Sequence, residues 1–261
     1  MQRYKNKESR DISGILLLDK PKGISSSFVL NKIKQLFSAN KIGHAGTLDP
    51  LATGMLLVCF GEATKFAKYF LHSDKRYQVV AQLGISTDTF DADGAIVRVS
   101  SATKLNDKKL AQCLEHFKGV MNQIPPMFSS LKYRGLPLYK YARKGINVPR
   151  KPRSVRIYDL SILKKTENAI ELNVHCSKGT YIRSMVNDIG EYLGCGAHVV
   201  ALRRLSIGKY ISSSMINMTT LESIFYNDFF DDSEVFCQLD ALLISMSTIK
   251  SNCINIANKQ C

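Results

Sequence analysis

The chain lacks the long apolar segments that membrane-spanning and secreted proteins carry. Its longest unbroken apolar run, Met55 to Phe60, is far shorter than the ~18 residues that a membrane span needs. The apolar stretch from Ile15 to Leu18 is followed at once by Asp19 and Lys20, which makes it too short for the core of a signal peptide. We therefore expect no membrane partner and a cytoplasmic location.

Short motifs of several large enzyme classes are also missing. The sequence contains neither Gly-x-x-x-x-Gly-Lys-Ser/Thr nor Gly-x-Gly-x-x-Gly, so binding of a nucleotide cofactor is not indicated. It has no Gly-x-Ser-x-Gly and no His-Glu-x-x-His, which argues against serine hydrolases and zinc proteases. We expect an activity that uses no cofactor.

The seven cysteines form no Cys-x-x-Cys pair, and their odd number favours scattered reduced thiols over a disulfide framework. One group, His175 and Cys176 with Cys195 and His198, has the residue types of a zinc site. Adjacent residues of a strand point to opposite faces, however, so His175 and Cys176 would not converge on one ion. We expect buried thiols here and no metal.

Acidic residues are scarce in the first four fifths of the chain. The 36 Lys and Arg outnumber the 22 Asp and Glu, and the formal net charge is +14. No acid occurs between Glu115 and Asp159, an interval with ten Lys or Arg and four interleaved tyrosines, at 133, 139, 141 and 158. Such a stretch suits a nucleic-acid backbone, although a solvated basic face or an anionic-membrane contact would have the same composition. The candidate backbone contacts are Lys132, Arg134, Lys140, Arg143 and Lys144.

The hydrophobic pattern predicts an α+β fold with a mostly antiparallel sheet, because helices and strands mix irregularly and several strands are joined by hairpins. With 261 residues, the chain is one large domain or two modest ones. We expect strands at 14–18, 55–60, 76–83, 95–99, 155–163, 169–176 and 199–205, and helices at about 26–37, 62–71, 110–117 and 181–193. Residues 122–153, rich in Pro, Gly and basic residues, are expected to be an excursion from this scaffold.

Two loops hold candidate chemical groups. Residues 41–54 contain too many glycines for a helix, and they place the single carboxylate Asp49 between small or rigid neighbours, with His44 five residues earlier. A turn aspartate before Pro50 is an equal interpretation at this point. In the second loop, Thr180 is expected to cap a helix, and Arg183 in its first turn calls for an anionic partner, for which Asp49 is a candidate.

A third cluster, Asp88, Asp91 and Asp93 before Gly94, has carboxylates that a calcium loop could use. The spacing is wrong for that site, since Ser100 stands about where a closing Glu is needed. An Asx-rich turn between two strands is the favoured interpretation.

Several segments in order resemble the TruB family of tRNA pseudouridine synthases. They are Gly14–Pro21 (GILLLDKP), Gly43–Gly54 (GHAGTLDPLATG), Lys75–Tyr77 (KRY), Asp88–Gly94 (DTFDADG), Pro125–Lys132 (PPMFSSLK), Cys176–Arg183 (CSKGTYIR) and Gly196–Leu205 (GAHVVALRRL). The match covers roughly residues 13–210. The resemblance implies a pseudouridine-synthase fold with an RNA-gripping insertion, and conversion of uridine 55 in the T loop of tRNA to pseudouridine.

The resemblance also implies roles for single residues. Asp49 matches the family's catalytic aspartate, Arg183 the arginine paired with it, and Tyr77 the tyrosine that stacks on the target base. His44 matches the histidine that helps to rearrange the T loop. The uridine pocket would be lined by Tyr181 and Leu202, and Lys20 lies in the first motif with a less defined role. The resemblance implies the T arm of tRNA as the partner. The reaction needs the base to be flipped out but requires no metal, and nothing in the sequence demands more than a monomer.

The chain departs from the family pattern near its C-terminus. Family members commonly carry a further RNA-binding domain, whereas only about 18 residues follow Leu243, and a compact module usually needs ~40 or more. We expect a catalytic domain at 1–245 that includes the insertion 122–153, then a residual polar tail at 246–261 in place of the accessory domain.

Three other functions fit parts of the sequence. A catalytically silent tRNA-binding or tRNA-folding protein would use the same basic surface, but it would not need Asp49, Tyr77 and Arg183 together. A nucleoside hydrolase could use Asp49 on a glycosidic bond, yet the basic insertion favours a polymeric substrate. A DNA-binding protein is the weakest alternative, because no segment resembles a helix that reads the major groove.

Overall fold

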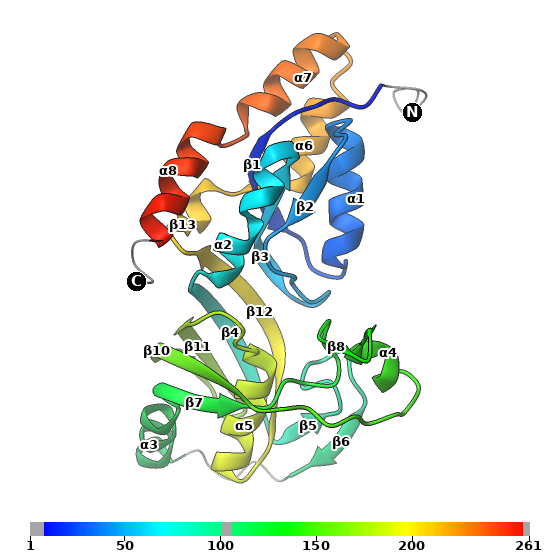
Figure 1. Ribbon diagram of the computed structural model, residues 1–261. Helices are drawn as coiled ribbons and strands as arrows, with labels where there is room; N and C mark the ends of the chain where they lie inside the picture. Colours follow the sequence, from blue (N-terminus) through cyan, green and yellow to red (C-terminus); the bar gives the residue numbers. More distant parts are fainter. Residues whose placement is uncertain (1–7, 101–105, 258–261) are drawn as a thin grey trace. The chain divides into compact units, whose positions relative to one another are not determined.

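The computed structural model describes residues 8–100 and 106–257, which form two compact units (Figure 1). Unit 1 comprises Met1–Lys75 and Arg203–Cys261, and unit 2 comprises Arg76–Leu202. Both mix helices with strands, and most of the strand pairs are antiparallel, so the α+β expectation is confirmed.

Unit 1 is built on the strand pair β1 (Gly14–Lys20) and β3 (Thr53–Phe60). The other strands are β2 (Ile42–His44), β13 (Tyr210–Ile211), β14 (Ile216–Asn217) and the end of β12 (Ala197–Ile207). The helices are α1 (Ser26–Leu36), α2 (Ala67–His72), α6 (Met218–Phe225), α7 (Asp232–Ala241) and α8 (Met246–Ala257), with 3₁₀ turns η1 (Gly61–Phe66) and η2 (Ser212–Ser214).

Both faces of β1 and β3 are buried, which explains why these strands read as continuous apolar runs. Leu16 and Leu18 face one core, which α1, α6 and α7 complete. Ile15 and Leu17 face a second core, to which α2 and α8 contribute. Figure 1 shows these two groups of helices on either side of the strand pair. Because successive strand residues point to opposite faces, one apolar run can serve two cores.

Unit 2 contains a second set of strands in the order β12, β4, β11, β10, β7. Their bounds are β4 Lys75–Leu83, β7 Gly119–Gln123, β10 Arg153–Lys165 and β11 Ala169–Cys176. Smaller pairs are β5 (Ile85–Thr87) with β6 (Ile96–Val99), and β8 (Lys132–Tyr133) with β9 (Leu136–Pro137). The helices are α3 (Asp107–Phe117), α4 (Leu138–Ala142) and α5 (Ile182–Leu193). Helix α5 ends at Gly194 as expected, where φ is +85°.

Three details of the sequence-based expectations are wrong. Residues 42–44 of the predicted loop form strand β2, because their backbone pairs with β3. Thr180 does not cap α5; its hydroxyl donates to the Ser177 carbonyl (2.9 Å), and Tyr181 is the N-cap residue. Residues 246–257 of the predicted tail form helix α8, which buries Ile249 and Cys253 in unit 1, while 258–261 lie outside the described residues.

Among the described residues, no helix has the length and apolarity that crossing a bilayer requires.

Candidate active site

The loop that carries Asp49 joins β2 to β3 in unit 1, and hydrogen bonds fix the backbone on both sides of the aspartate. The Ser26 hydroxyl, at the start of α1, donates to the Leu48 carbonyl (2.8 Å) and accepts from the Leu48 N–H (2.9 Å). The Ala52 N–H donates to the Asp49 carbonyl (3.1 Å). Asp49 itself is half-buried. The loop therefore presents its carboxylate from a fixed backbone.

Arg204 on β12 binds both ends of this loop. Its side chain is 2% exposed, and its guanidinium donates to the carbonyls of Met55 (2.7 Å), Gly46 (3.0 Å) and Thr47 (3.5 Å). Gly54 allows the close approach of β12, because its φ is +92° and a Cβ there would lie 2.3 Å from the Arg204 carbonyl oxygen. Arg204 was not among the site residues predicted from the sequence. The available signal was a charged residue at an inward position of a strand, in alternation with the buried Leu202 and Ser206.

Lys20 holds the same loop from β1. It is fully buried, and its Nζ donates to the carbonyls of Pro21 (2.8 Å), Ile24 (2.8 Å) and Pro50 (3.3 Å). Burial lowers the pKa of the Lys20 ammonium to about 8, the Asp49 carboxylate opposes that shift, and Arg204 adds to it. Lys20 is thus within electrostatic reach of both Asp49 and Arg204.

His44, at the end of β2, belongs to the same electrostatic group. Burial lowers its pKa, and the positive charge of Arg204 lowers it further, so the neutral imidazole is favoured near pH 7. Its Nδ1 is a buried atom for which the described residues supply no hydrogen-bond partner. Unit 1 therefore brings together His44, Asp49 and Lys20 from the predicted site.

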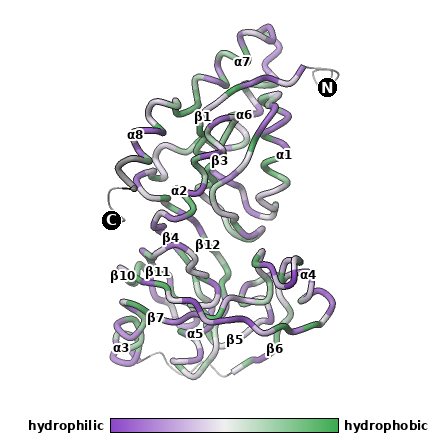
Figure 2. The backbone as a smooth tube through the Cα atoms, in the orientation of Figure 1, coloured by the Kyte–Doolittle hydropathy of each residue, from purple (hydrophilic) through white to green (hydrophobic). Residues whose placement is uncertain are grey.

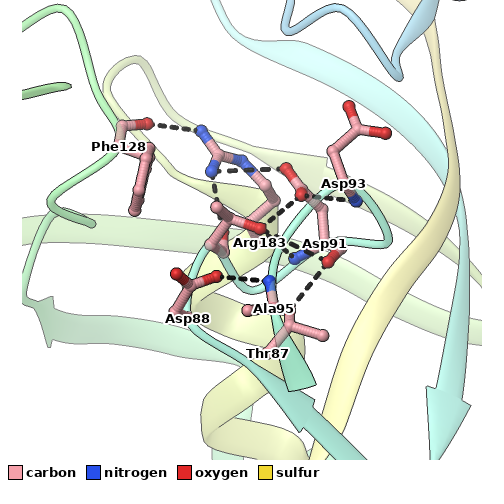
Figure 3. A network of polar contacts seen from close by, with 8 residues as sticks. Thr87, Asp88, Asp91, Asp93, Ala95, Phe128 and Arg183 are labelled. Atoms are coloured by element: carbon pink, nitrogen blue, oxygen red, sulfur yellow. Dashed lines mark hydrogen bonds and ion pairs between the residues drawn. The ribbon is translucent and has the colours of Figure 1, made fainter. Parts of the chain in front are cut away.

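Arg183 is the centre of a buried network in unit 2 (Figure 3). Its guanidinium lies 3.4 Å from the Asp91 carboxylate and donates to the carbonyls of Thr89 and Phe128, each at 2.8 Å. Arg183 is 4% exposed and Asp91 is 5% exposed. The expectation of an anionic partner for this arginine at a helix N-terminus is confirmed, with Asp91 in that role.

Asp91 belongs to the turn 88–94, which joins β5 to β6 as the Asx interpretation predicted. Asp91 Oδ1 accepts from the Thr89 hydroxyl (2.5 Å) and from the Asp93 N–H (3.1 Å), and Asp88 Oδ1 accepts from the Ala95 N–H (2.8 Å). No cluster of His, Cys, Asp or Glu suitable for a metal ion occurs among the described residues. Asp91 was predicted only as a turn residue, but its carboxylate also pairs with Arg183.

The other predicted pocket residues lie in unit 2. Tyr77 on β4 and Leu202 on β12 are buried and belong to neighbouring strands, while Tyr181 is half-buried at the start of α5. Asp49 and Arg183 belong to different units, so their pairing stays a prediction.

The basic excursion is a distinct segment of unit 2, and its two ends meet in the sheet. Gln123 at the end of β7 pairs with Arg153 at the start of β10, which places the predicted boundaries 122–153 beside each other. Between them are the β8–β9 hairpin and helix α4. Figure 2 shows hydrophilic residues along much of the chain beside α4. The five candidate RNA-backbone residues Lys132, Arg134, Lys140, Arg143 and Lys144 are all exposed.

Two of these arginines lie over tyrosine rings. The Arg134 guanidinium lies over the Tyr133 ring and that of Arg143 over the Tyr139 ring, each 5.4 Å from the centroid. Tyr141 packs against Tyr133 edge-on, with centroids 5.8 Å apart, and its hydroxyl donates to the Tyr133 carbonyl (3.1 Å). The insertion thus presents charge from an ordered hairpin and helix.

Two family models match the chain, and curated relatives are similar to it over most or all of its length. The family described as "TruB family pseudouridylate synthase (N terminal domain)" matches residues 34–182, and "tRNA pseudouridylate synthase B C-terminal domain" matches residues 183–249. The protein named tRNA pseudouridine synthase B in Blochmanniella pennsylvanica is 73% identical over 261 residues, which is all of both chains. The protein of that name in Shigella boydii is 50% identical over 246 residues, 94% of this chain and 78% of the relative.

Two solved structures share the fold. An H/ACA ribonucleoprotein bound to a substrate RNA containing 2'-deoxyuridine has a chain 25% identical to this one, with a TM-score of 0.62 over 85% of this chain. The present chain spans 57% of that chain. A Cbf5-Nop10-Gar1 complex has a chain 24% identical with a TM-score of 0.64, over 90% of this chain and 66% of its own. With both family domains matched and full-length relatives at high identity, the chain belongs to the TruB family of pseudouridylate synthases.

Proposed function

We propose that this chain isomerises uridine 55 in the T loop of tRNA to pseudouridine, acting as a cytoplasmic monomer. The relatives named tRNA pseudouridine synthase B support tRNA as the substrate. The observation that carries the proposal is the single carboxylate, Asp49, presented by a loop that Ser26, Lys20 and Arg204 fix through its backbone. The exposed basic insertion supports binding of the T arm.

The reaction breaks the N1–C1′ bond, turns the base and forms a C5–C1′ bond. C5 loses its proton and N1 ends with one, so the product has the composition of the substrate. Asp49 would attack the base or the ribose, or it would assist removal of the 2′ proton on a glycal route. A carboxylate near an oxocarbenium-like centre is the device that glycosidases use, but no leaving oxygen needs a proton here, so one carboxylate suffices.

The base has to leave the stack to reach this carboxylate, at a cost of a few kcal/mol. In our proposal, stacking on Tyr77 and contacts from Tyr181 and Leu202 offset that cost, and the neutral His44 helps to rearrange the T loop. Arg183 is the partner that the family resemblance assigns to the Asp49 carboxylate. The Asp91 carboxylate, 3.4 Å from Arg183, supports this role because it fixes the guanidinium before RNA binds.

Pseudouridine mapping tests the proposal. The purified protein is incubated, without added cofactor, with an unmodified tRNA transcript and with the same transcript carrying cytidine at position 55. We expect one new pseudouridine, at position 55, in the first transcript and none in the second. Modification elsewhere would contradict the assigned position. Tight binding of tRNA with no product would instead indicate the silent tRNA-binding protein.

A further inference from the structure

The N-terminus of α5 is tied to the first segment of the basic insertion by three side chains. Gln123 bonds to the backbone of Tyr181, the Ser184 hydroxyl donates to the Ile124 carbonyl (3.3 Å), and Arg183 donates to the Phe128 carbonyl (2.8 Å). All three contacts join residues 123–128 to residues 181–184, within unit 2. Tyr181, one of the residues predicted to line the uridine pocket, is therefore connected directly to the base of the insertion.

Gln123 makes the most specific of these contacts. Its side-chain Nε2 donates to the Tyr181 carbonyl (2.9 Å), and its Oε1 accepts from the Tyr181 N–H (2.8 Å). The side chain is 2% exposed. One amide thus bonds to both backbone groups of the α5 N-cap residue, whose carbonyl also accepts from the Met185 N–H (3.1 Å) and whose own side chain makes no capping bond. A primary amide offers a donor and an acceptor side by side, which no carboxylate or apolar side chain can do.

The backbone of Gln123 fixes the other end of the connection. It is the last residue of β7, and it pairs with Arg153, where the chain returns from the insertion into β10. A shift at the base of the insertion therefore acts on Gln123, and Gln123 acts on Tyr181.

We propose that Gln123 is a positioning residue that couples the RNA-binding insertion to the uridine pocket. It holds Tyr181 and the first turn of α5 at a fixed place relative to the insertion, so that an RNA bound by the insertion is aligned with the pocket. The inference rests on the proposed function, because it takes the insertion as the tRNA-binding element and Tyr181 as a pocket residue.

Two substitutions remove the contact in different ways. Gln123→Met keeps the length of the side chain and removes both hydrogen bonds. Gln123→Glu keeps an acceptor for the Tyr181 N–H but turns a carboxylate oxygen toward the Tyr181 carbonyl, which is repulsive. The control is Gln82→Met, the same change in the same unit, at a half-buried glutamine whose amide makes one long bond (3.5 Å) to the neighbouring Leu83 carbonyl.

The experiment measures the single-turnover rate constant on saturating tRNA and the dissociation constant for the same tRNA. Small misplacements of a reacting group cost up to ~10²-fold in rate, so we expect about a 10-fold or larger loss for both Gln123 variants. The dissociation constant should change less than about 3-fold, since the exposed cations are retained. Gln82→Met should match the wild type in both quantities.

A fluorescent 2-aminopurine beside the target nucleotide gives a readout that general destabilisation would not change. We expect slower or reduced unstacking with the Gln123 variants at full tRNA occupancy. If Gln123→Met fails to fold, as judged by its thermal unfolding, Gln123→Glu carries the test.

A wild-type rate constant in a folded Gln123 variant at saturation would overturn the inference, as would a loss of affinity with the saturated rate intact. Failure of the proposed function has a different signature, because the wild-type protein itself would then form no pseudouridine in tRNA.

Discussion

The two units use buried cations in different ways. In unit 1, Lys20 and Arg204 donate to backbone carbonyls of the loop that carries Asp49. In unit 2, Arg183 donates to carbonyls too, but it also pairs with the carboxylate of Asp91. Neutral carbonyls do not cancel the charge of a cation, so Arg204 and the protonated form of Lys20 place positive charge beside the loop that carries Asp49. A cation beside a carboxylate is partly neutralised and serves mainly to fix geometry.

The comparison suggests a division of roles. In our proposal, unit 1 supplies the reacting group on a fixed backbone, and unit 2 supplies the tRNA-binding insertion and the predicted pocket residues. Substitutions of Asp49 or of the side chains that hold its loop should change the rate and the stability of the loop, whereas substitutions of the exposed cations of the insertion should change affinity.

Removing the Asp49 carboxylate should have the largest effect. We expect Asp49→Asn to lower the single-turnover rate by about 10⁴-fold or more, as loss of an essential reacting group does elsewhere. Binding of tRNA should remain within a few-fold, because the insertion is untouched. The matched control is Asp11→Asn, an exposed aspartate of unit 1 that accepts from the Asn40 side chain. Normal turnover by Asp49→Asn would remove the aspartate from its assigned role.

Replacing the buried guanidinium of unit 1 should come next. Arg204→Met leaves three loop carbonyls without their donor, so we expect a loss of about 3 kcal/mol in the free energy of unfolding. The neighbouring Arg203→Met breaks a half-buried bidentate pair with Asp19 (2.6 and 2.9 Å) and should cost about 1 kcal/mol or less. Urea unfolding measures both. Equal losses for the two variants would show that Arg204 does not hold the loop.

Removing cations from the insertion should give a smaller effect, on affinity. Lys140→Ala combined with Arg143→Ala should weaken tRNA binding several-fold at ~0.1 M salt and lower the slope of log K against log salt by about 1.5. The control pair, Lys108→Ala with Lys164→Ala, removes two exposed cations of unit 2 outside the insertion. If both pairs change the slope equally, the insertion has no special part in binding.

The smallest expected effect is the pH dependence that Lys20 contributes. Its folded pKa, about 8, lies below the ordinary value of 10.5, so the folded chain releases this proton first as pH rises. Between these values the unfolded chain binds more protons, and stability therefore rises with pH, by at most about 1 kcal/mol from pH 8 to 9. Lys20→Met should lack this rise in urea unfolding at the two pH values. An equal change in the free energy of unfolding between pH 8 and pH 9 in the wild type and in Lys20→Met would contradict this assignment to Lys20.

The elements with strong local signals were predictable. Short segments of sequence are enough to predict the apolar strand β1, the helical spacing of α1 and the end of α5 at Gly194. The excursion at 122–153 was predictable from composition, and the pairing of Gln123 with Arg153 agrees with its boundaries. Helix α8 was missed although Met246, Ile249, Cys253 and Ile256 recur at helical spacing, and the core of unit 1 buries Ile249 and Cys253.

The supporting residues of the candidate site were not predictable in the same way. Arg204 binds Met55 across 149 positions of sequence, and Gln123 binds Tyr181 across 58. Neither contact can be inferred from neighbouring residues. A buried polar side chain needs hydrogen-bond partners, and here only folding brings those partners close. Asp91 was identified as a turn residue from its neighbours, while its ion pair with Arg183 needed the fold.

The central claim is that the Asp49 carboxylate of unit 1 is required for the reaction and that the exposed cations of the insertion set the affinity. The most direct test measures the dissociation constant and the saturated single-turnover rate on one tRNA for Asp49→Asn and for the Lys140→Ala, Arg143→Ala pair. The account predicts that the first variant binds tRNA but does not convert it, and that the second binds weakly yet reacts at nearly the wild-type rate when saturated. Lost binding in Asp49→Asn, or a saturated rate that collapses with the insertion cations, would contradict it.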